Sequence, residues 1–77
     1  MAKSDGCVVR VGNRWFVAWY DANQYQWRGP LMSMSRAGGA YLWYAWTIEQ
    51  VARIADRSYA HKRSAVRAAR RVYGDDD

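Results

Sequence analysis

The chain has 77 residues, of which 51% are hydrophobic and 16% aromatic, and it carries a formal net charge of +5. A single domain of this length buries only about 60% of the surface of its unfolded chain, so aromatic rings must supply much of the core. The only cysteine, Cys7, excludes an internal disulfide. No apolar run approaches the roughly 20 residues that span a bilayer, and no export signal is present, so we expect a cytoplasmic globular protein with no membrane partner.

The first predicted elements form a β-hairpin. Residues 7–11 are rich in β-branched side chains and are followed by Gly12 and Asn13. Both residues tolerate the positive φ angles that two-residue hairpin turns require. The return strand is "RWFVAWY", residues 14–20, whose side chains alternate between two faces.

Two further strands are expected. The third extends from Tyr25 to about Met34 and is interrupted at Gly29 and Pro30, where the missing proline amide favours an edge strand or a bulge. The segment "SRAGGA" is the next turn, and "YLWYAW", residues 41–46, is the fourth strand.

The carboxyl-terminal half has a helical pattern. Thr47 is followed three residues later by Gln50, which matches a capping box, and apolar residues then recur at steps of three and four through residue 73. Gly74 is typical of a helix end. These features predict a mostly continuous helix, with Ser58 as the point at which a second helix would begin.

The chain is therefore predicted to belong to the α+β class, as one domain over residues 1–77. A four-stranded antiparallel meander (7–46) packs against a carboxyl-terminal amphipathic helical segment (47–73), which is followed by an acidic tail (74–77). The Ile/Val/Ala/Tyr stripe of the helix is expected to cover one face of the sheet.

One helix leaves the other face of a sheet uncovered, yet both faces of the second and fourth strands carry large rings. Half-exposed cross-strand packing, a protein interface and a stacking surface for unpaired bases would each account for this excess. On the fourth strand, Tyr41 and Trp43 share one side, and Leu42, Tyr44 and Trp46 share the other. The candidate interface residues are Tyr41, Trp43, Tyr44, Trp15 and Trp19, with a second copy of the chain or another protein as the partner.

The last helix is strongly basic, because residues 61–71 contain five lysines and arginines and no acid. Such a run is either a solvated helix face or a phosphate-binding surface. Arginine favours bidentate contacts, so the expected partner is nucleic acid or an acidic protein surface. The candidate nucleic-acid-binding residues are Lys62, Arg63, Arg67, Arg70 and Arg71, together with Arg14 and Arg28 on the strands. The tail Asp75–Asp77 is a candidate competitor for these arginines.

Catalytic signatures are missing from the sequence. His61 is the only histidine, and no carboxylate or thiol at helical spacing orients it for acid–base work. Ser64 has no neighbouring base, and Gly38-Gly39 does not begin a phosphate-binding loop. We therefore expect no enzyme activity, cofactor, metal or small-molecule substrate.

The segments "RWFVAWYD" and "SYAHKRSAVRAARRV" resemble a group of small proteins in which a Trp-rich meander leads into an aromatic-x-x-Lys-x-x-Ala helix entry, here Tyr59, Lys62 and Ala65. The arm-type DNA-binding domains of phage integrases have this layout. Residues 47–58 have a helical pattern where those domains have a strand, so no functional residue is transferred. The Trp- and Arg-rich composition is also similar to that of small phage accessory proteins, several of which inhibit host defences.

These patterns favour a small, non-enzymatic nucleic-acid-binding accessory protein that uses its basic helix. The alternative is a protein-interaction module, such as a phage-type inhibitor of a host or defence complex, that uses an exposed aromatic sheet face.

Overall fold

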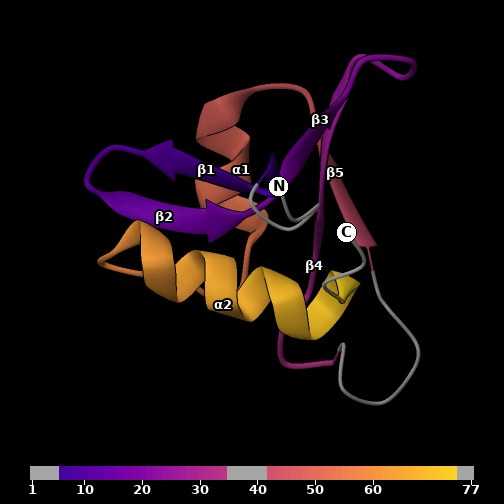
Figure 1. Cartoon of the computed structure of the whole chain (residues 1–77). Coiled ribbons are helices and arrows are strands. Elements are labelled where there is room, and N and C mark those ends of the chain that lie inside the picture. Colours follow the sequence, from indigo (N-terminus) through magenta and orange to yellow (C-terminus); the bar gives the residue numbers. More distant parts are fainter. Residues whose placement is uncertain (1–5, 35–41, 75–77) are drawn as a thin grey trace.

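The computed structural model describes residues 6–34 and 42–74. Its elements, in chain order, are β1 (Val8–Val11), β2 (Arg14–Val17), β3 (Trp19–Asp21), β4 (Gln26–Pro30), β5 (Leu42–Ala45), α1 (Ile48–Ile54) and α2 (Lys62–Tyr73). The strands form two antiparallel sheets, β1-β2 and β3-β4-β5 (Figure 1). The predicted α+β class is confirmed. The predicted turn at 35–40, Tyr41 and the tail Asp75–Asp77 lie outside the described residues.

The predicted hairpin is present. Val11 pairs with Arg14, so Gly12 and Asn13 form the two-residue turn. Gly12 has a φ of +64°, which an L side chain rarely adopts, and glycine at the first turn position is typical of the type II′ turns that join twisted strands.

The four-stranded meander is not confirmed, because the predicted return strand divides at Ala18. β2 ends at Val17 and pairs with β1, whereas β3 begins at Trp19 and pairs with β4. Ala18 is buried, and its amide donates to the Cys7 carbonyl at 3.0 Å. The chain thus leaves one sheet and enters the other within a single residue.

The middle strand of the second sheet is β4, although Gly29 and Pro30 predicted an edge strand or a bulge. β3 pairs only with residues 26–28, so beyond Arg28 the strand β4 has β5 as its sole paired neighbour among the described residues. Pro30 therefore occupies a local edge, where its missing amide is tolerated. β4 also ends at Pro30 and does not reach Met34.

A close contact between backbone and ring fixes the end of this sheet. Gly29 pairs with Trp43, whose indole lies against the glycine so closely that an added Cβ would overlap it. The buried Trp43 Nε1 donates to the Pro30 carbonyl at 3.1 Å. Glycine is required here because no side chain fits beneath the ring.

The capping box is confirmed at the start of α1. The Gln50 amide donates to Thr47 Oγ1 at 3.3 Å, and the Thr47 amide donates to Gln50 Oε1 at 3.2 Å. The mostly continuous helix is wrong, because α1 ends at Ile54 and α2 begins at Lys62. Between the two helices, Tyr59 exchanges backbone hydrogen bonds of 2.7 and 2.8 Å with Trp15 of β2, and this pairing requires extended backbone.

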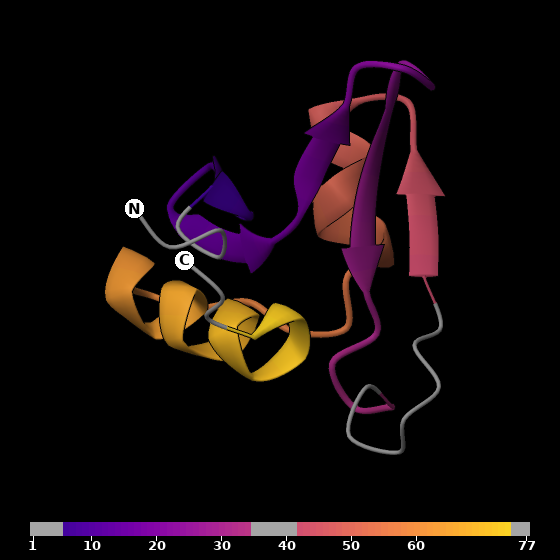
Figure 2. The same cartoon turned by 45° about the vertical axis from the view of Figure 1, so that its right-hand side comes forward.

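The β1-β2 hairpin lies between the two helices (Figures 1 and 2). One core is formed by Phe16, Ala18, Trp43, Ala45 and Val51, with α1 on its outer side. The other is formed by Cys7, Val17, Ala68 and Ala69, with α2 on its outer side. Two helices therefore cover opposite faces of the hairpin, which explains why β2 carries apolar residues on both of its faces.

The connection after β4 is fastened to the end of α1. Asp56 accepts the amides of Met32 and Ser33 at 3.0 Å each and the Ser33 hydroxyl at 2.7 Å. Partial burial raises the pKa of Asp56, but these hydrogen bonds outweigh it and hold the pKa below the usual 3.8. No helix of the described residues is long and apolar enough to cross a membrane.

Candidate nucleic-acid interface

The two sides of α2 differ sharply in character. Ala65, Ala68 and Ala69 are fully buried against the hairpin. The exposed side carries Arg63, Arg67, Arg70 and Arg71. At 100° per residue these four side chains fall within an arc of about 100°, and they extend along about 12 Å of helix. We call these four residues the arginine face.

The charge of α2 is one-sided, because the helix contains five basic residues and no acidic one. Lys62 and Arg63 lie in its first turn, where the helix dipole disfavours cations. The N-cap residue His61 makes no side-chain capping bond. Among the described residues the only ion pair joins Arg28 to Asp21, so Arg63, Arg67 and Arg71 have no acidic partner there. The two first-turn cations are therefore unfavourably placed with respect to the helix dipole.

Basic residues continue from α2 onto the hairpin. The Lys62 ammonium lies over the Trp15 ring, 5.8 Å from its centroid. Arg14 donates to Ser58 Oγ at 3.1 Å and to the Ser58 carbonyl at 3.2 Å. Each of these contacts holds a cation near the amino-terminal end of α2.

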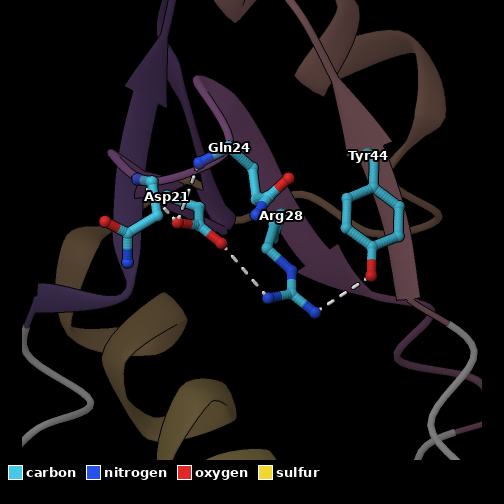
Figure 3. Close-up of polar contacts among 5 residues, drawn as sticks. Asp21, Gln24, Arg28 and Tyr44 are labelled. Carbon is cyan, nitrogen blue, oxygen red and sulfur yellow. Dashed lines mark hydrogen bonds and ion pairs between the residues drawn. The ribbon is translucent and has the colours of Figure 1, made fainter.

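Arg28 has a different role, which Figure 3 shows. Its guanidinium donates to Asp21 Oδ2 at 3.3 Å and to the Tyr44 hydroxyl at 2.9 Å. It also lies 4.9 Å from the Tyr44 centroid and 5.3 Å from that of Trp19, so it is held between two rings. Asp21 neutralises this charge, and Arg28 therefore joins the three strands to one another.

The predicted interface residues are dispersed. Trp43 is only 6% exposed and belongs to the core, whereas Tyr44 is 46% exposed. Trp15 and Trp19 are half-buried, Trp15 beneath Lys62 and Trp19 against Arg28 and α2. Tyr41 lies outside the described residues. Of the described candidates, only Tyr44 is well exposed to solvent.

The exposed side of β5 carries Leu42, Tyr44 and, just beyond the strand, Trp46, which is 65% exposed. Because side chains alternate along a strand, these residues lie on the other face of β5 from the buried Trp43 and Ala45. Among the described strands, β5 also lies at one edge of its sheet. The sequence showed that these three residues share a face, but it did not show which face the helix leaves uncovered.

The sequence did not predict a cavity of about 590 Å³ between the start of β1 and the strands β3 and β4. Its aromatic lining comes from Trp19, Tyr20, Trp27 and Tyr73. Tyr20 and Trp27 meet edge to face, with centroids 5.3 Å apart. Burial, aided by the nearby Cys7, raises the pKa of Tyr73 to about 12. Four separate segments supply this lining, so no local sequence pattern indicates the cavity.

The described residues hold no group of three or more histidine, cysteine or acidic side chains that could hold a metal ion. Comparisons with protein families, with curated proteins and with solved structures gave no match. A functional assignment therefore has to come from the geometry of the arginine face, the β5 surface and the cavity.

Proposed function

We propose that this chain is a small, non-enzymatic accessory protein that binds nucleic acid through the arginine face of α2, with Lys62 and Arg14 at one end. The observation that carries the proposal is the arginine face itself, which holds four exposed arginines on a helix without a single acid. Guanidinium groups bind phosphate oxygens in bidentate fashion, and each neutralised phosphate releases a counterion. A cytoplasmic location fits this role.

The placement of these cations supports a role in binding. Lys62 and Arg63 oppose the helix dipole, so a favourable interaction with the dipole does not account for their presence. The arginine face extends along about 12 Å, which is long enough for its guanidinium groups to contact more than one phosphate of a strand. Several contacts can then form at once, as a salt-dependent interaction requires.

The test compares two double variants that remove the same charge. Arg67→Gln/Arg71→Gln alters the arginine face, and Arg53→Gln/Arg57→Gln alters two exposed arginines at the same spacing elsewhere. Anisotropy titrations of a labelled oligonucleotide at several salt concentrations measure both. We expect the first pair to weaken binding roughly 10- to 100-fold at 0.1 M salt and to reduce the salt slope by about 2. Equal losses in both pairs, or no binding by the native chain at low salt, would refute the arginine face as the site.

A second function, protein interaction, is favoured by the β5 surface. Leu42, Tyr44 and Trp46 are exposed together on an edge strand, and edge strands readily pair with another chain. Self-association through this surface would form a homodimer, and binding to a host or defence complex would make the chain a phage-type inhibitor. Sedimentation equilibrium should show a dimer that Trp46→Ser dissociates. A monomer at all concentrations would exclude self-association.

A further inference from the structure

The aromatic cavity adjoins the carboxyl-terminal end of the arginine face. Tyr73, which lines the cavity, follows Arg70 by three residues on α2. Residues at this spacing are neighbours on a helix, with Cβ atoms about 5–6 Å apart. A strand whose phosphates lie along the arginine face therefore passes the mouth of the cavity.

The lining of the cavity suits a flat ring. Trp19, Tyr20, Trp27 and Tyr73 supply aromatic surfaces, and the remaining lining residues are small or aliphatic, such as Val9 and Ala18. The cavity volume of about 590 Å³ is in the range of small-molecule sites. Tyr20 is 47% exposed, so the cavity can be reached from solvent without disturbing either core.

The Tyr73 hydroxyl is a polar group of this lining whose proton lacks a hydrogen-bond acceptor in the described part of the chain. The Tyr73 hydroxyl is buried and forms no hydrogen bond of good geometry with the described residues. The neighbouring Trp19 indole can only donate, so the hydroxyl proton has no acceptor there. With its pKa raised to about 12, the hydroxyl stays protonated at neutral pH and can act as a donor. Buried polar groups normally have partners, and a ligand with an acceptor on its edge would supply one here.

We propose that the cavity binds one unstacked base of a single-stranded nucleic acid whose phosphates contact the arginine face. The base stacks on the face of one of the Tyr20 and Trp27 rings and meets the other at its edge, because the two rings are inclined at 69°. The edge of the base accepts a hydrogen bond from the Tyr73 hydroxyl. This inference rests on the proposed function, because the arginines hold the strand beside the cavity. Stacking tolerates any base, so the site distinguishes unpaired from paired strands more than it distinguishes sequences.

The experiment compares two labelled single strands of equal length, oligothymidylate and a strand of abasic sugar phosphates. Both carry the same phosphates, and only the first has bases. We expect the native chain to bind oligothymidylate roughly 5- to 150-fold more tightly, with quenching of the intrinsic tryptophan fluorescence. Tyr20→Ala should remove most of this difference, and Tyr73→Phe should remove part of it. The matched control is Tyr25→Ala, which changes a 72% exposed tyrosine outside the cavity and should preserve the preference.

The possible failures are distinguishable. Equal binding of both strands, with binding still lost in Arg67→Gln/Arg71→Gln, would overturn base insertion and leave the arginine face as the binding site. No binding of either strand at low salt would overturn both proposals. The comparison of the two strands uses the native chain, so it decides the matter even if Tyr20→Ala fails to fold.

Discussion

The contact between Gly29 and Trp43 provides the sharpest test of the fold. In Gly29→Ala the new methyl group would lie 2.6 and 2.7 Å from Cε2 and Cη2 of the Trp43 indole, closer than side-chain carbons approach one another. The ring has to move, and the movement disrupts the 3.1 Å bond from Nε1 to the Pro30 carbonyl. Overpacking costs about 1–3 kcal/mol and the lost hydrogen bond about 0.5–1.5 kcal/mol, so we expect a loss of about 2–4 kcal/mol.

For a domain of this size, that loss lowers the Tm by roughly 10–30 °C. Thermal unfolding followed by circular dichroism measures it, with Gly6→Ala as the control, because no described residue lies within 4 Å of a Cβ at Gly6. In a Trp43→Leu background the substitution at Gly29 should cost much less, since the indole is gone. A change below 0.5 kcal/mol in Gly29→Ala, or an equal cost in both backgrounds, would show that the ring contact does not constrain the strand.

Three further predictions concern stability. Asp56→Asn should lower the free energy of unfolding in urea by about 1 kcal/mol at pH 7. Because folding lowers the pKa of Asp56, the stability that the carboxylate adds is present above pH 3.8 and is lost as the pH falls further. If the native chain and the variant differ as much at pH 3 as at pH 7, the Ser33 contact is contradicted. Tyr73 has a folded-state pKa of about 12 against 10.0, so its contribution is present below pH 10 and is lost as the pH rises toward 12. Tyr73→Phe should therefore reduce this alkaline loss of stability by about 1–2 kcal/mol, and identical profiles would argue against burial of the hydroxyl. Thr47→Ala removes the α1 capping box and should cost about 1 kcal/mol in thermal unfolding, with Thr47→Ser largely neutral.

The features that the sequence predicted well are those set by near neighbours. The turn at Gly12, the capping box at Thr47 and the helix end at Gly74 each depend on a few adjacent residues. The basic side of α2 follows from helical periodicity alone, so most of the arginine face could be identified before the structure was known.

The features that it missed depend on distant residues. The break at Ala18 follows from burial between two cores, and the extended segment before α2 follows from pairing between Trp15 and Tyr59. The contacts of Arg28 with Asp21 and Tyr44 were not predicted, because its neighbours in sequence do not reveal these residues across the strands. A single strand pattern also cannot show that a second helix will cover its other side.

The alanine side of α2 has a consequence for how this protein can evolve. Ala65, Ala68 and Ala69 are fully enclosed, so a larger residue at any of them would push the helix away from the hairpin. The arginines opposite are exposed, and we expect that exchanging them costs the fold little. Selection can therefore retune what the helix binds without destabilising its attachment, and homologues should keep small residues on one side of α2 while their charges diverge on the other.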